Sequence, residues 1–300
     1  MRSFVADPVS EDLLEHGEGP RWDAVRDELV CVDIMAGAVH RWAFRGGRLA
    51  PVRSYVLDRP VGAANPLADG SGWLLAAGTG FVRLDEDGTT TELVDAAPGR
   101  GEVLRMNEAV CDPAGRVVAG LMAYDTAPGS GWVVSGDLDG GVRTLIPRTT
   151  IANGTAWDSE GTTMFWSDSG EGTLAAFGYD PATGALGARR EVLRRDRADG
   201  VADGIALDDD GCVWAALWGG RSVLRVNPTG EVLAVVDLPV DQPSAVAFAG
   251  TTLLVTTSRE GLDASTLAGQ PLAGALFAVD VGVSGPPARP FRGELPERLV

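Results

Sequence analysis

The chain has 300 residues, of which 45% are hydrophobic and 22% charged, as in an ordinary folded protein and unlike a disordered one. Its formal net charge of −17 argues against a nucleic-acid partner, because a phosphate backbone would be repelled. Forty glycines and eighteen prolines indicate a chain that turns often.

The N-terminal residues 1–20 lack the apolar core of a secretory signal, and no stretch approaches the roughly 18 apolar residues of a membrane-spanning helix. The three cysteines, Cys31, Cys111 and Cys212, lie far apart, each within an apolar run. We therefore expect buried thiols rather than a disulfide framework or a cysteine-rich metal site. The protein is expected to be cytoplasmic, with no membrane partner.

A turn signal recurs along the chain. The motif Asp-x-x-Gly recurs, for example at Asp85, Asp112, Asp158 and Asp208, and the last three of these copies each follow one short apolar run and precede another. Together with three comparable settings these copies mark six units, at Asp23, Asp69, Asp112, Asp158, Asp208 and Ala249. The steps between the markers are 46, 43, 46, 50 and 41 residues. Short β-rich runs between turns indicate an all-β fold, and a period in the forties is typical of propeller blades.

We therefore predict an all-β, six-bladed β-propeller with four-stranded blades, forming one domain over residues 1–300. The blades are expected between about residues 14 and 282, with a short C-terminal tail after them. Residues 1–10 are a candidate for a strand that joins the last blade and closes the ring. The alternative is a two-sheet sandwich, which would not need a regular repeat.

One position of the repeat, five residues before each marker, is rich in polar side chains. Its six occupants are Glu18, Ala64, Asn107, Asn153, Asp203 and Ser244. The first strand of each propeller blade lines the central channel, so equivalent positions converge on the axis. Carboxylate and amide oxygens meeting there suit a hard divalent cation. The alternative is that Asn153-Gly154 and Asp203-Gly204 are ordinary turns, a role for which Glu18 is poorly suited.

Several motifs in a fixed order extend this pattern from about residue 14 to residue 282. They include Gly17-Glu-Gly-Pro-Arg-Trp-Asp23, Arg105-Met-Asn107, Asn153-Gly154, Phe165-Trp-Ser-Asp-Ser169, Asp203-Gly204 and Trp218-Gly-Gly220. Each motif is weak alone, but their ordered set resembles the SMP-30/gluconolactonase/regucalcin family. The resemblance implies a six-bladed propeller with one divalent ion at the channel mouth, which could be calcium, zinc, manganese, magnesium or iron(II).

By position, the resemblance implies that Glu18, Asn153 and Asp203 bind the ion. It places Asn107 beside the ion, in contact with the substrate or with a metal-bound water, and Arg105 against the oxygens of the substrate. An acidic substrate contact of the family corresponds most nearly to Asp125. Two adjacent acids are more usual there, whereas here Tyr124 precedes a single aspartate.

The implied activity is metal-dependent hydrolysis of a small lactone, such as the sugar lactone gluconolactone, with Asp203 as the general base. The alternatives are hydrolysis of another ester class, such as a phosphotriester, and calcium binding without catalysis. A Ser-His-Asp triad would need one of the two histidines, and the chain has no Gly-x-Ser-x-Gly motif. His16, two residues before Glu18, could approach the site, whereas His40 lies in a strand-like run. The sequence does not indicate an oligomeric state.

Overall fold

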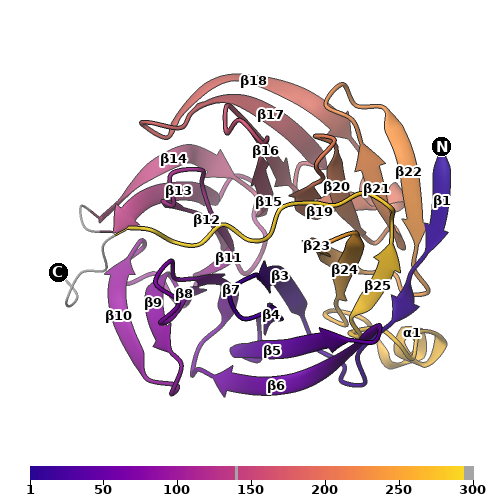
Figure 1. Ribbon diagram of the computed structural model, residues 1–300. Coiled ribbons are helices and arrows are strands. Elements are labelled where there is room, and N and C mark those ends of the chain that lie inside the picture. The colour runs from indigo at the N-terminus through magenta and orange to yellow at the C-terminus, as the bar shows by residue number, and fades with distance from the viewer. Residues whose placement is uncertain (139–140, 294–300) are drawn as a thin grey trace.

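The computed structural model describes residues 1–138 and 141–293, which form six antiparallel sheets arranged in a ring (Figure 1). Blade 1 contains β3 (Gly17–Asp23), β4 (Glu28–Asp33), β5 (Ala38–Arg45) and β6 (Arg48–Val56). Blade 2 contains β7 (Val61–Pro66), β8 (Gly72–Ala77), β9 (Gly80–Asp85) and β10 (Thr90–Asp95). Blade 3 contains β11 (Leu104–Cys111), β12 (Val117–Ala123), β13 (Gly131–Leu138) and β14 (Gly141–Thr149).

The second half of the chain repeats the same arrangement. Blade 4 contains β15 (Ala152–Trp157), β16 (Thr163–Asp168), β17 (Thr173–Asp180) and β18 (Ala185–Arg194). Blade 5 contains β19 (Val201–Leu207), β20 (Val213–Trp218), β21 (Ser222–Val226) and β22 (Val232–Asp237). Blade 6 begins with β23 (Pro243–Ala249), β24 (Thr252–Thr257) and β25 (Phe277–Asp280). The predicted six-bladed propeller is confirmed, and the sandwich alternative is wrong.

The N-terminal residues join two neighbouring blades. The strand β2 (Asp7–Pro8) pairs antiparallel with β25 and is the outer, fourth strand of blade 6. The strand β1 (Arg2–Val5) pairs in parallel with β22 and gives blade 5 a fifth strand, which the repeat did not indicate. Since strands from both ends of the chain share one sheet, pairing between them closes the ring.

The first strand of each blade faces the centre of the ring, and each contains a β-bulge. In β11, β15, β19 and β23 the bulge includes the repeat position identified above, whereas in β3 it directly follows Glu18 and in β7 it lies at Gly62, before Ala64. In β15 the pairing register shifts after Ala152, and in β19 it shifts after Ala202. A bulge inserts an extra residue and changes the direction of a side chain. Asn153-Gly154 and Asp203-Gly204 therefore lie inside strands, and the interpretation of these pairs as ordinary turns is wrong.

The glycines of these two pairs are explained by close approach between blades. A Cβ atom on Gly154 would clash with the backbone of Ile205, and a Cβ on Gly204 would clash with Ala245 of the next blade. Glycine lets the inner strands converge without a side chain between them. The first residue of each pair, Asn153 or Asp203, carries the polar side chain.

The Asp-x-x-Gly motifs form tight turns, as their sequence suggests. The amide of Gly161 donates to the carbonyl of Asp158 at 3.0 Å, and the amide of Gly211 donates to that of Asp208 at the same distance. These turns join the inner strand of a blade to its second strand. Each repeat marker therefore lies where the first strand of a blade turns into its second strand.

Residues 282–293 cross one face of the ring and are called the C-terminal strap below (yellow in Figure 1). The carbonyl of Ser284 accepts a hydrogen bond from the amide of Asp209 in blade 5, and the amide of Arg292 donates to Gly115 in blade 3. Phe291 is 2% exposed and packs in the core between blades 2 and 3. The tail expected after residue 282 is thus a segment that binds several blades.

Helix is scarce among the described residues. It comprises a single 3₁₀ turn, η1 (Arg197–Asp199), and the short helix α1 (Ala264–Gly269). Neither is long and apolar enough to cross a membrane. The three cysteines are buried and unbonded, as expected.

Candidate functional site

The centre of the ring contains two cavities with different lining residues. The larger has a volume of about 430 Å³ and is lined by residues from the first halves of the inner strands and by segments outside those strands. The smaller, of about 110 Å³, is lined by residues from the second halves of these strands and by the C-terminal strap. Because the inner strands run in the same direction, equivalent positions lie at the same depth in the channel.

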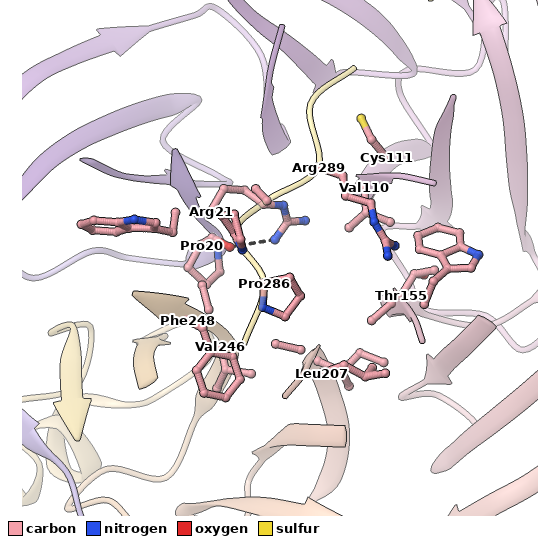
Figure 2. A pocket seen from close by; sticks show the side chains of 18 of the residues that line it. Pro20, Arg21, Val110, Cys111, Thr155, Leu207, Val246, Phe248, Pro286 and Arg289 are labelled. Carbon is pink, nitrogen blue, oxygen red and sulfur yellow. Dashed lines mark hydrogen bonds between the residues drawn. The ribbon is translucent and has the colours of Figure 1, made fainter. Parts of the chain in front are cut away.

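The strap covers the smaller cavity. Figure 2 shows Pro286 of the strap close to Pro20, Phe248 and Leu207, which belong to three different blades. Arg289 of the strap also lines this cavity. The four polar residues of the repeat position line the larger cavity instead, and we therefore place the candidate site there.

Four of the predicted residues converge on this cavity from four blades. They are Glu18 of β3, Asn107 of β11, Asn153 of β15 and Asp203 of β19. All four are buried, with between 3% and 7% of their surface exposed. The remaining two members of the repeat position, Ala64 and Ser244, do not line the cavity.

The two carboxylates oppose each other's ionisation. Burial, followed by the negative charge of Glu108, raises the pKa of Glu18 to about 8. Burial, followed by the charges of Glu18 and Glu108, raises the pKa of Asp203 well above its usual value. Asp203 Oδ1 is buried and has no hydrogen-bond partner among the described residues. A divalent cation placed between the two carboxylates would stabilise both charges and give this oxygen a partner.

A chain of hydrogen bonds orients the two amides. Arg105 Nη1 donates to Asn107 Oδ1 at 2.6 Å, and Asn107 Nδ2 donates to Asn153 Oδ1 at 3.0 Å. Asn153 Nδ2 donates to Ser169 Oγ at 2.8 Å, and that hydroxyl donates to the carbonyl of Ala202 at 2.8 Å. The chain crosses blades 3, 4 and 5, so the direction of each amide is set by its neighbours.

The donor set consists of oxygen atoms. Within residues 1–138 and 141–293, no three histidine, cysteine, aspartate or glutamate side chains gather as a metal cluster. The candidate centre combines only two carboxylates, Glu18 and Asp203, with the amide oxygen of Asn153. Carboxylate and amide oxygens are ligands of hard cations such as Ca²⁺. The residues present therefore fit a single divalent cation with two balancing charges.

Arg105 lies next to these groups. It is 4% exposed, and its burial lowers the pKa of the guanidinium. Its Nη1 atom bonds the amide oxygen of Asn107 and the carbonyl of Met106. The structure thus brings Arg105 together with the predicted ion ligands.

Asp125 is not brought together with them. It is exposed, it does not line the cavity, and its Oδ1 accepts a hydrogen bond from the amide of Ala127 at 3.0 Å. Its neighbours Tyr124 and Thr126 line the cavity in its place. This wall of the cavity is therefore formed by Tyr124 and Thr126 rather than by an acidic residue.

His16 and Glu260 are two cavity residues whose pairing the sequence did not indicate. His16 Nδ1 lies 2.5 Å from Glu260 Oε2, and the imidazole packs against the Trp218 ring with centroids 5.4 Å apart. The hydrogen bond from His16 holds the pKa of Glu260 below its usual value. Glu260 lies in an irregular segment after β24, where the repeat has no marker. His40 is distant from the cavity lining and bonds Ser54.

Ser169 is a further cavity residue that the repeat did not indicate. It lies in Phe165-Trp-Ser-Asp-Ser169, one of the motifs that carry the family resemblance. We expect Ser169→Ala to weaken Ca²⁺ binding about tenfold, because it frees the amide that supplies the Asn153 oxygen. Titration calorimetry on the purified variant measures the effect. Ser54→Ala, which removes a hydroxyl far from the cavity, is the control. An unchanged affinity in Ser169→Ala would show that the amide needs no such support.

Comparisons with known proteins identify the family of this chain. Residues 16–259 match the family described as SMP-30/Gluconolactonase/LRE-like region. Regucalcin of Gallus gallus is 33% identical over 310 residues, covering 98% of this chain and 100% of the relative.

Two solved structures add to this match. A structure described as a calcium-binding protein, regucalcin, from Agrobacterium tumefaciens superposes with a TM-score of 0.89 at 25% identity, covering 97% of this chain and 98% of the other. A gluconolactonase from Xanthomonas campestris has a TM-score of 0.71 at 18% identity, covering 94% of this chain and 97% of the other, and supports the fold alone. By its matched sequence and its shared propeller, the chain belongs to the SMP-30/gluconolactonase/regucalcin family.

Proposed function

We propose that this protein is a divalent-metal-dependent hydrolase that opens a small lactone, with sugar lactones such as gluconolactone as the first candidates. The observation that carries the proposal is the convergence of Glu18, Asn153 and Asp203 on one cavity, beside Arg105. Membership of a family that includes gluconolactonases supports the same reaction. The protein would act on a small molecule, since the cavity of about 430 Å³ suits a ligand of that size.

Glu18, Asn153 and Asp203 would hold the cation. When bound, a divalent cation polarises a carbonyl oxygen and makes water more acidic. Calcium, zinc, manganese, magnesium and iron(II) are all candidates for this oxygen-rich site. Calcium has specific support, because the similar structure from Agrobacterium tumefaciens is described as a calcium-binding protein.

Asp203 and Arg105 have different roles in the proposed reaction. Asp203 takes the proton of the attacking water and returns it to the ring oxygen that leaves the carbonyl carbon. A general base must be ionised to accept this proton, and a cation bound beside Asp203 would favour its ionised form. Arg105 has several N–H groups beyond Nη1, and these would donate to the oxygen that gains negative charge.

The amides position the reacting groups. Asn107 accepts from Arg105 and donates to Asn153, so it links the guanidinium to the ion ligand. This link keeps Arg105 in the cavity although no carboxylate holds it. A small shift of either amide would move both the cation and the oxyanion donor.

The test combines metal analysis with a rate measurement. The purified protein is assayed with a pH indicator against a panel of aldonolactones and one organophosphate, before and after EDTA dialysis. We expect lactone hydrolysis that is lost with EDTA and restored by a divalent cation. Full activity in the metal-free protein would contradict the mechanism. Preferred hydrolysis of the organophosphate would favour phosphotriester chemistry, and cation binding without any hydrolysis would favour a calcium-binding role.

A further inference from the structure

Two arginines line the larger cavity without an acidic partner. Arg105 is buried in the channel and Arg197 is exposed at the turn η1. Within residues 1–138 and 141–293, neither guanidinium forms an ion pair with a carboxylate.

Two arginines on the neighbouring surface do form ion pairs. Arg194 Nη2 lies 2.8 Å from Glu191, and Arg221 Nη1 lies 2.9 Å from Asp241. Arg197 differs from these two in lining the cavity and in having no such partner among the described residues. These ion pairs show that acidic residues are present on the neighbouring surface, although none of them pairs with Arg197.

The segment that carries Arg197 is held in place by its own contacts. Arg195 Nη2 donates to the carbonyl of Asp199 at 2.6 Å, and Arg195 Nε donates to that of Gly200 at 2.9 Å. The acids that flank Arg197 in the chain, Asp196 and Asp199, do not line the cavity. The backbone of η1 is thus held by hydrogen bonds from Arg195, and Arg197 lines the cavity.

The acids of the cavity are already engaged. Glu260 lies 2.5 Å from His16, and Glu18 and Asp203 form the candidate cation site. Arginine binds carboxylate and phosphate groups through two parallel N–H bonds, and at the edge of a cavity it attracts anions. The positive charge of Arg197 is therefore free to bind a ligand.

We propose that the substrate of this protein is an anionic lactone, whose carboxylate or phosphate substituent binds Arg197 while the lactone ring lies against Arg105 and Asp203. This inference rests on the proposed lactonase function and narrows its substrate class. Neutral sugar lactones would be hydrolysed more slowly, because they leave the guanidinium of Arg197 without its ligand. On this proposal Arg197 selects for charge, while Arg105 and Asp203 take part in the reaction.

The test uses lactones that differ only in their charged substituent, with the metal-loaded protein. D-glucaro-1,4-lactone carries a carboxylate where D-glucono-1,4-lactone carries a hydroxymethyl group. A phosphate arm compares 6-phospho-D-glucono-1,5-lactone with D-glucono-1,5-lactone. We expect at least one anionic member to have the higher kcat/KM, and the arm that shows the preference identifies the anion.

Variants then assign the preference to one side chain. Arg197→Gln should raise KM for the preferred anionic lactone about fivefold, the effect of one exposed ion pair, with kcat unchanged. It should leave the neutral partner unaffected, and Arg197→Lys should recover part of the preference. Arg190→Gln makes the same change of charge on the outer strand β18, away from the cavity, and should alter neither substrate.

The outcomes separate the two proposals. Equal or faster hydrolysis of the neutral lactones would overturn the charge preference and leave the lactonase function intact. A preference that survives Arg197→Gln would show that Arg197 does not provide it, and would also overturn the inference. Failure to hydrolyse any member of either pair would overturn the proposed function, and the inference with it.

Discussion

Replacement of Asp203 by asparagine is expected to abolish lactone hydrolysis while the propeller stays folded. The change keeps the size of the side chain but removes the only group assigned to accept a proton from water. Loss of a general base typically slows a reaction by about 10²- to 10⁴-fold, and loss of an ion ligand adds to this. The measurement is kcat for the best lactone of the panel, with circular dichroism to verify the fold.

The matched control is Asp7→Asn, an equal change at an exposed acid of the outer strand β2 that does not line the cavity. It should keep activity within about twofold of wild type, because surface substitutions away from a site have small effects. The buried carboxylate of Asp203 is costly to ionise, so Asp203→Asn should not lower the melting temperature in EDTA. An active Asp203→Asn enzyme would remove this residue from the mechanism.

The second prediction concerns thermal stability, pH and the cation. The pKa of Glu18 is about 8 in the folded protein and 4.5 in a free chain, so the folded state holds the proton more tightly. Its contribution to stability is therefore complete below about pH 4.5 and is lost as the pH rises through about 8. Asp203 acts in the same direction, because its pKa is also raised. We expect the melting temperature in EDTA to fall between about pH 5 and pH 8.

Added Ca²⁺ should reverse this fall. At low pH protons compete with the cation for the two carboxylates, whereas near pH 8 the cation binds their ionised forms. A cation at about a thousand times its Kd stabilises the folded state by about 4 kcal/mol. Differential scanning calorimetry with EDTA or CaCl₂ across this pH range measures both effects.

A Glu18→Gln/Asp203→Asn double variant separates these groups from all others that titrate. It should lose the cation effect and much of the fall with pH, since both raised carboxylates are gone. If the wild-type melting temperature near pH 8 were the same in EDTA and in Ca²⁺, the two carboxylates would not form a calcium site. The other divalent cations are then compared in the same assay.

The number of blades could be predicted from the sequence because it depends on a repeat. The same holds for the polar ring, by which we mean the four polar residues of the repeat position, Glu18, Asn107, Asn153 and Asp203. Every Asp-x-x-Gly turn between the first two strands of a blade uses the same local chemistry, so markers such as Asp112 and Asp158 recur at similar intervals. A ring then places equivalent residues at one depth, and Asn153 and Asp203 are neighbours in space although 50 residues apart in sequence. Residues that recur at a regular interval in the sequence therefore meet at one site in the folded ring.

The rest was decided by the tertiary structure. The segments between blades have no period, so nothing local showed that Arg197 would face the cavity, that Asp125 would face away from it, or that residues 282–293 would cover the opposite end. The contact between His16 and Glu260 joins the start of blade 1 to a segment after β24, and it forms only once the ring closes. Local turn chemistry and repeated spacing thus determine the propeller and its polar ring, whereas the walls of the cavity depend on which irregular segments the closed ring brings together.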